Sequence, residues 1–293
     1  LGCKILGEDG HYFVGYYDID PVSESGDEVL CHRVSTNYTH QSEPDVGDLG
    51  LLSISTGKFS KFAETNALNW QLGSRVRWLT NETVIYNDVV DGQQCSIAYN
   101  IKQNKIEKYY KRPFWALSPN KEIGASLNFA RIREKRPGYG YAGKSPDGHD
   151  EVLTLFSIEN DDILFQIDLG AILEKVGFTC PPNVDPYLNH VTWSTCSTKF
   201  LTLFHFDDPV SLKRSIYPVL IDCSDYSVSL FYDEGIFSHH VWVDDKSLIG
   251  FVEQDGKRGF ALWTHDQGWE KMGENMPHLD GHPSLVPGYS DAI

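Results

Sequence analysis

The segment SHHVWVDDKSLIGFV, Ser238 to Val252, decides the fold because its pattern recurs along the chain. It consists of a short strand-like stretch ending in tryptophan, a polar turn and an apolar strand. Two other segments follow the same order, SRVRWLTNETVIYND (Ser74 to Asp88) and NHVTWSTCSTKFLTLF (Asn189 to Phe204). The tryptophans in the shared position are Trp78, Trp193 and Trp242. A signature repeated in this way indicates a repeat architecture.

Weaker copies extend the pattern. PFWALSPNKEIGASL (Pro113 to Leu127) and GHPSLVPG (Gly281 to Gly288) have leucine in the tryptophan position, and GYYDIDPVSESGDEVLCHRV (Gly15 to Val34) has a longer turn. Copies lie about 40 to 75 residues apart, which is typical of four-stranded β-propeller blades. The predicted blades begin near residues 11, 70, 112, 186, 236 and 278.

The fold class predicted is all-β, a single β-propeller domain over residues 1–293. Short segments rich in β-branched and aromatic residues alternate with Gly, Asn, Asp and Ser turns, whereas only Asp168 to Val176 indicates a helix. A β-sandwich is the alternative, but it gives no reason for the recurring signature. The last copy stops soon after its turn begins, so we expect a ring that is truncated at its C-terminal end and seven-bladed at full length.

Composition limits the possible functions. The formal net charge of -16 argues against nucleic-acid binding, which needs a basic surface. No run of about 18 apolar residues predicts a membrane span. The six cysteines lack CxxC spacing, which favours free thiols and a cytoplasmic rather than a secreted or periplasmic location. The sequence does not predict the oligomeric state.

The residue three places before the tryptophan position is titratable in most copies. The residues in this position are Arg75, His190, His239 and His282, with Phe114 in the third copy. Because the first strand of a blade runs beside the central channel, we expect these side chains to surround one axis. In an extended segment, His278 and Asp280 share the face of His282. The histidines outside this position, which we expect to be structural, are His32, His40, His149, His205 and His265.

The same pattern predicts a metal site. His239 and His282, with a further His or carboxylate such as His278, suit a divalent ion such as manganese, zinc or iron, with calcium as a further alternative. Such an ion would attract an anionic ligand despite the acidic chain. We expect Arg75 to bind a carboxylate, and His190, held off the metal, to remove a proton near neutral pH.

Other residues are candidates for substrate contact. These are Tyr17 and, in the basic insertion Ala130 to Gly148, Arg131 and Arg133. Tyr16 and Tyr17 could stack on a sugar, although core packing is the simpler explanation.

The two imidazoles of SHHVW are expected on opposite faces of their strand, because neighbours in a strand point to opposite faces. We predict that His239 faces the channel and that His240 packs between blades.

The motifs HHVW (His239 to Trp242), NHVTW (Asn189 to Trp193), GHPS (Gly281 to Ser284) and HYFVGYYDIDP (His11 to Pro21) resemble the oligogalacturonate lyase family of seven-bladed propellers. The propeller ulvan lyases are a more distant resemblance. The resemblance implies polysaccharide degradation by β-elimination on uronic-acid-containing oligosaccharides, with a manganese-like ion neutralising the uronate carboxylate.

Matched residue by residue, the resemblance makes His239 and His282 metal ligands and His190 the base. The chain departs from the family's Gln-x-x-His-x-His cluster, because it has His278, Asp280 and His282 in that region. The alternative function is a non-catalytic propeller that binds a glycan or a protein. A hydrolase is disfavoured because no carboxylate pair occupies the shared position.

Overall fold

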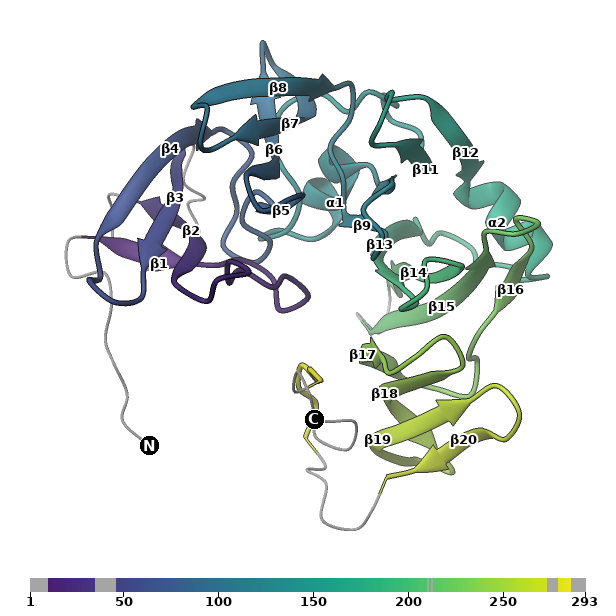
Figure 1. Ribbon diagram of the computed structural model, residues 1–293. Helices are drawn as coiled ribbons and strands as arrows, with labels where there is room; N and C mark the ends of the chain where they lie inside the picture. The colour runs from purple at the N-terminus through teal and green to yellow at the C-terminus, as the bar shows by residue number, and fades with distance from the viewer. Residues whose placement is uncertain (1–9, 35–45, 210, 212, 273–278, 286–293) are drawn as a thin grey trace. The chain divides into compact units, whose positions relative to one another are not determined.

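The structure of the chain is a computed structural model (Figure 1), and it describes residues 10–34, 46–209, 211, 213–272 and 279–285. Within these residues, five antiparallel sheets of four strands follow one another along the chain. Each strand pairs with the next one in sequence, so every sheet is a simple meander. This is the architecture of β-propeller blades, and the predicted fold class is confirmed. The number of blades in a complete ring stays a prediction.

The chain divides into two compact units, residues 1–114 with 126–150, and residues 115–125 with 151–293. Unit 1 contains two sheets. The strands of the first sheet are β1 (His11–Phe13), β2 (Glu28–Val34), β3 (Gly47–Ser53) and β4 (Phe59–Thr65). The strands of the second sheet are β5 (Arg77–Trp78), β6 (Thr83–Val90), β7 (Gln93–Asn100) and β8 (Lys105–Tyr110).

Unit 2 contains the other three sheets. The third sheet comprises β9 (Ala116–Leu117), β10 (Ile123–Ser126), β11 (Val152–Ser157) and β12 (Ile163–Asp168). The fourth comprises β13 (Tyr187–Trp193), β14 (Lys199–Asp207), β15 (Arg214–Asp222) and β16 (Val228–Leu230). The fifth comprises β17 (Phe237–Trp242), β18 (Ser247–Gln254), β19 (Lys257–Thr264) and β20 (Gly268–Lys271).

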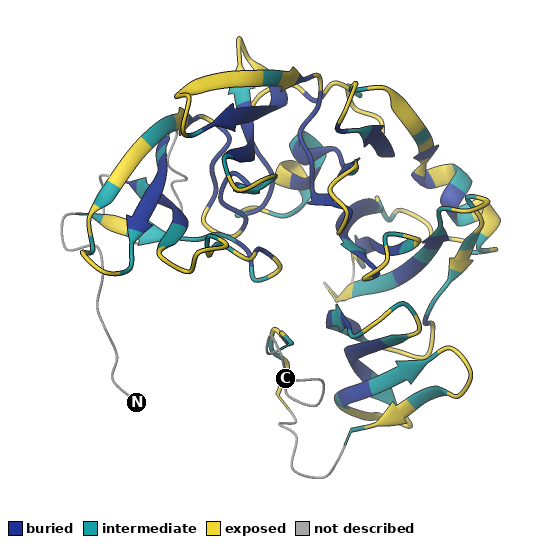
Figure 2. Cartoon of the chain, in the orientation of Figure 1, coloured by how far each residue is buried: buried dark blue, intermediate teal, exposed yellow. Residues whose placement is uncertain are grey.

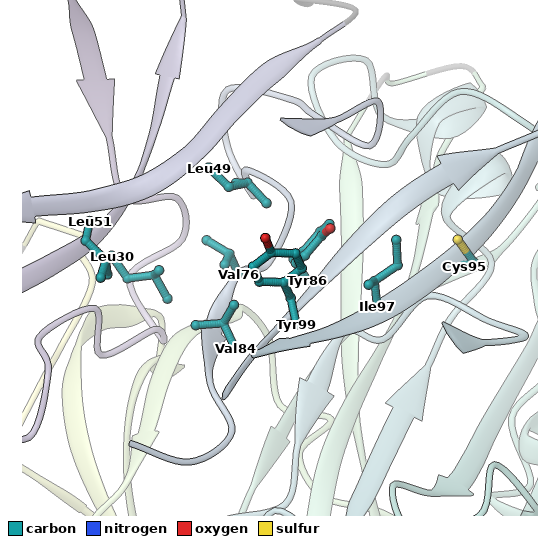
Figure 3. Close-up of a cluster of buried hydrophobic side chains, with 9 residues drawn as sticks. All are labelled: Leu30, Leu49, Leu51, Val76, Val84, Tyr86, Cys95, Ile97 and Tyr99. Atoms are coloured by element: carbon teal, nitrogen blue, oxygen red, sulfur yellow. The ribbon is translucent and has the colours of Figure 1, made fainter. Parts of the chain in front are cut away.

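Burial follows the position of a strand in its sheet (Figure 2). Most of β6 is buried, whereas β8, the fourth strand of the same sheet, is mainly exposed. In unit 1, apolar side chains of the first two sheets form one core (Figure 3). Its residues are Leu30, Leu49, Leu51, Val76, Val84, Tyr86, Cys95, Ile97 and Tyr99. Burial of these faces supplies the main favourable free energy of packing between the sheets.

The recurring tryptophan has a structural reason. The indole Nε1 of Trp78 donates to the carbonyl oxygen of Pro21 at 3.2 Å, and that of Trp242 donates to Thr192 at 3.1 Å. Pro21 lies between β1 and β2, and Thr192 lies on β13, so each acceptor belongs to the sheet that precedes its tryptophan along the chain. The buried Nε1 of Trp193 makes no hydrogen bond with a described residue. In two of the three strong copies, the tryptophan therefore fills the core between sheets and ties the sheets together.

Two short helices interrupt the strands. Helix α2 (Leu169–Lys175) confirms the predicted helix, and Asp168 caps it by accepting a hydrogen bond from the Ala171 amide at 2.8 Å. The expectation of a single helix was wrong, because the basic insertion forms α1 (Phe129–Lys135), capped by Asn128. One helical turn buries Phe129 and Ile132, a pattern too short to recognise among the surrounding charges.

The remaining sequence expectations concern the last copy, the membrane and the cysteines. Residues 279–285 contain no strand, and the blade start predicted near 278 lies outside the described residues. The described chain has no helix that is both long and apolar enough to cross a membrane. The cysteines of the described ranges are free thiols, as predicted, and Cys31 and Cys95 are buried.

Candidate functional site

In unit 1, Arg75 binds a carboxylate of the chain itself. Arg75 precedes β5 with φ 58, and its side chain is fully buried. Its Nη1 and Nη2 donate to the two carboxylate oxygens of Asp18 at 2.8 and 2.6 Å. This bidentate geometry is the one predicted for a substrate carboxylate, but here Asp18 supplies the oxygens. No sequence pattern indicated this partner, because 57 residues separate Asp18 from Arg75.

A second guanidinium lies against the same carboxylate. Arg77 Nη2 is 3.7 Å from Asp18 Oδ2. Burial by itself raises the pKa of Asp18, but Arg75 and then Arg77 outweigh it and hold the pKa below its ordinary value of 3.8. Burial, with Arg75 adding to it, lowers the pKa of Arg77 to about 10. Asp18 is therefore a carboxylate at neutral pH, shared by two cations.

The candidate residue Tyr17 lies beside this cluster. Its ring is 4.7 Å from that of Tyr16, and the Tyr16 ring lies 5.9 Å from the Arg75 guanidinium carbon. Tyr16 is buried, as core packing predicts, whereas Tyr17 is half-buried. The structure therefore brings Tyr17 and Arg75 into one region of unit 1.

The candidates Arg131 and Arg133 belong to α1. Arg131 pairs with Glu134 at 3.4 Å, and Arg133 is exposed. Residues two positions apart in a helix lie on different sides of it, so one ligand carboxylate cannot contact both in the same way.

In unit 2, His190 occupies a β-bulge. The pairing of β13 with β14 shifts register between Asn189 and Val191, and His190 has φ 63. Thr202 Oγ1 donates to the His190 carbonyl at 2.9 Å and supports the bulge. A bulge redirects the side chain of its extra residue. Arg75 has the same left-handed backbone in the equivalent position of its own repeat, whereas Phe114 and His239 do not.

His190 is nine-tenths buried among aromatic and polar groups. Its ring lies 5.0 Å from that of Trp115 and 6.3 Å from that of His205. Asn189, which is fully buried, has neither amide atom hydrogen-bonded to a described residue. His205 was expected to be structural because it lies outside the register that His190 shares. Only the pairing of β13 with β14 brings them together.

The fifth sheet presents His239 next to the segment 279–285. His239 Nδ1 lies 2.8 Å from Asp280 Oδ1, and the His239 and His282 ring centroids are 4.0 Å apart. Ser238 Oγ donates to Asp280 Oδ2 at 2.8 Å. With Nδ1–H donating to Asp280, the lone pair of His239 lies on Nε2. Ser238 is on the Nδ1 side, so these residues are not arranged as a Ser-His-Asp triad, in which serine contacts Nε2.

The donor set partly fits a divalent metal ion. An imidazole whose Nδ1 is held by a carboxylate is the usual arrangement of a metal-binding histidine, and Asp280 holds His239 in this way. Burial, and then the neighbouring His239, lowers the pKa of His282, which favours the neutral imidazole that metals bind. No group of three or more His, Cys, Asp or Glu side chains in the described ranges could hold a metal. The third predicted ligand, His278, lies outside those ranges.

His240 differs from His239 in burial, although the pairing of β17 with β18 shifts register between Phe237 and His240. It is buried, and its ring lies 5.0 Å from that of Phe237. His239, by contrast, keeps 29% of its side chain exposed. Phe114, in the same register of the third copy, is fully buried.

His32 was expected to be structural, and its contacts are those of a structural residue. Its Nε2 accepts from the Ser74 amide at 2.9 Å, so the proton lies on Nδ1, which donates to the Phe13 carbonyl at 3.3 Å. Gly73, at φ 58, packs over the ring, and an added Cβ would lie 2.4 Å from His32 Cε1. Burial lowers the pKa of His32 to about 4.

This burial predicts a loss of stability in mild acid. Because the unfolded imidazole titrates near 6.5 and the folded one near 4, the unfolded state binds more protons between these values. About 3 kcal/mol of unfolding free energy should be lost as the pH falls from 6.5 to 4, with no further loss from His32 below that range. Urea denaturation across this range measures it. His32→Gln should flatten the profile, whereas His265→Gln, at an exposed histidine, should not.

No family model matches the chain, and no curated protein matches it by sequence. Among solved structures, TolB from Acinetobacter baumannii is similar at 8% identity and a TM-score of 0.47, over 89% of this chain and 53% of TolB. The β-propeller domain of the Trilobed protease from Pyrococcus furiosus is similar at 8% identity and a TM-score of 0.48, over 92% of this chain and 72% of that one. An oligogalacturonate lyase in complex with manganese has 10% identity and a TM-score of 0.44, over 90% of this chain and 78% of the lyase.

These likenesses concern the fold alone. The chain is a β-propeller protein whose structural neighbours include lyases, proteases and WD40 proteins. It spans about half the length of TolB.

Proposed function

We propose that the chain is a metal-dependent polysaccharide lyase that cleaves uronic-acid-containing oligosaccharides by β-elimination. The observation that supports this most directly is the pair of imidazoles of His239 and His282, 4.0 Å apart, with Asp280 orienting one of them. The motifs that resemble the oligogalacturonate lyases include both histidines. The acidic oligosaccharide and the preference for manganese are parts of this proposal.

His239 and His282 would hold the ion, and His278 is the third proposed ligand. A divalent cation would supply positive charge that neutralises the uronate carboxylate and makes the neighbouring C5 proton more acidic. Asp280 keeps the proton of His239 on Nδ1 and so keeps its Nε2 in the form that binds a cation.

His190 is the proposed base. Its neutral imidazole takes the C5 proton, the electron pair of that bond forms the C4=C5 double bond, and the bond from C4 to the leaving oxygen breaks. The leaving sugar takes up a proton on that oxygen. The buried setting beside Trp115 restricts water near the imidazole, and the bulge fixes the direction of the side chain.

The test is an assay on oligogalacturonides and other uronate oligomers with manganese supplied. We expect the ultraviolet absorbance of a conjugated C4=C5 uronate to rise with time. His190→Ala should lower kcat by about 100-fold or more, whereas His265→Ala, at an exposed histidine, should leave it unchanged. If the absorbance does not rise with any substrate of the panel while metal is present, the proposal is contradicted.

A second candidate function is a non-catalytic propeller that binds a glycan or protein. The observation in its favour is that the described residues bring two imidazoles together rather than three metal ligands. It predicts that the purified chain retains no stoichiometric metal after dialysis. Elemental analysis therefore separates the two functions without any substrate.

A further inference from the structure

The cluster around Asp18 contains a guanidinium whose hydrogen bonds are incomplete. Arg77 lies on β5, where it pairs with Ile85, and only 15% of its side chain is exposed. Its Nε and Nη2 are buried and make no hydrogen bond with any residue that the structure describes. Asp18 Oδ2, 3.7 Å from Nη2, is too far for one.

Counted over Asp18, Arg75 and Arg77 of the described chain, the charges of the cluster do not balance. Arg75 and Arg77 carry two positive charges, and Asp18 supplies one negative charge that Arg75 binds at close range. An excess positive charge in a buried setting costs free energy unless an anion compensates it. The low pKa of Arg77 has the same origin, burial first and the neighbouring Arg75 second. One monoanion would neutralise the cluster, whereas a dianion would leave it negative.

Nε and Nη2 form one edge of the Arg77 guanidinium. Other arginines of this chain bind carboxylates with the same edge. Arg214 donates from Nε and Nη2 to the two oxygens of Asp207 at 2.8 and 3.0 Å. Arg33 donates from the same two nitrogens to a single oxygen of Asp48, Oδ2, at 3.2 and 2.8 Å. These atoms form the flat, parallel pair of donors that matches a carboxylate.

We propose that Arg77 binds the carboxylate of a small organic ligand through Nε and Nη2, next to the Asp18–Arg75 ion pair. In this arrangement Arg75 positions Asp18, and Arg77 is the residue that recognises the ligand. The nitrogens are enclosed, so the carboxylate enters with a local shift of the segment around Asp18, whose side chain is 25% exposed. The half-buried Tyr17 offers an aromatic face beside the cluster. The site requires neither a metal nor the elimination reaction.

The experiment measures the melting temperature with sodium acetate and with sodium galacturonate, each at an ionic strength held constant with sodium chloride. The wild-type chain should show a saturable rise with both carboxylates. Arg77→Met should weaken the apparent dissociation constant by about tenfold or more. Arg77→Met should also melt higher than wild type when carboxylate is absent, because the excess charge is gone. Arg77→Lys, which keeps the charge but lacks the parallel donors, should lose most of the response.

Arg214→Met is the matched control, because the same edge of Arg214 is already occupied by Asp207. It should keep the wild-type response. An equal response in wild type and Arg77→Met overturns the proposal, and so does a rise with sodium sulfate as large as that with acetate. The readout needs no turnover and no metal, so its failure is distinct from a failure of the lyase proposal.

Discussion

Replacing Asp18 with asparagine is expected to lower the free energy of unfolding by about 3 kcal/mol. Asparagine keeps the size of the side chain but removes the charge that compensates Arg75 and Arg77. The Arg75 side chain has no exposed surface, so water cannot replace the lost carboxylate. Breaking one partner of a buried pair leaves an uncompensated charge, which costs more than the pair itself contributes. Urea denaturation at neutral pH measures the loss.

The control for this variant is Asp207→Asn, which breaks an ion pair of the same geometry at the surface. Asp207 and Arg214 are 42% and 35% exposed, so the loss should stay below about 1 kcal/mol. Equal losses in the two variants would show that burial does not strengthen the Asp18 pair. A partial rescue of Asp18→Asn by Arg77→Met would confirm that excess positive charge causes the loss.

The same cluster gives a pH dependence with a definite sign. The pKa of Asp18 in the folded chain lies below 3.8, so its stabilising contribution is present above that value. The contribution is lost as the pH falls through the lower folded pKa. This loss lies below the window in which His32 titrates. Asp18→Asn should therefore reduce the acid phase, to which Asp48 and Asp245 also contribute through their lowered pKa values, while keeping the phase between pH 6.5 and 4.

The second large effect is expected at the adjacent histidines of β17. His239→Ala should abolish manganese binding, because it removes the imidazole that Asp280 orients and that lies beside His282. His240→Ala should leave binding intact and lower stability by about 2 kcal/mol or more, because it opens a cavity next to Phe237. Isothermal titration with manganese and urea denaturation, applied to both variants, separate the two effects.

The reverse result, binding lost in His240→Ala and kept in His239→Ala, would overturn the register that places His239 at the site. Asp280→Asn is a third, informative variant. It should weaken binding by about 10-fold or more while the stability changes little, since Asp280 is exposed and acts through His239. His265→Ala supplies the control for loss of an exposed imidazole.

The sequence determined the repeated elements of this protein. Each strand-turn-strand copy is encoded by neighbouring residues, so the period, the tryptophan position and the helix predicted from Asp168 to Val176 were all visible in the chain. The alternation of a strand likewise placed His239 and His240 in different surroundings. Helix α1 was not predicted, because its two buried positions, Phe129 and Ile132, span less than one full helical turn.

Only the tertiary structure decided which side chains meet. Asp18 reaches Arg75 across 57 residues, and Asp280 reaches His239 across 41. Such pairs depend on how loops between strands pack, and no local period encodes them. For the same reason, the repeat pattern indicated Arg75 as a candidate residue, but it could not show that the Arg75 guanidinium already donates to Asp18. The geometry around Asp18 shows that Arg77, two residues further along, has Nε and Nη2 donors for which the described residues offer no acceptor.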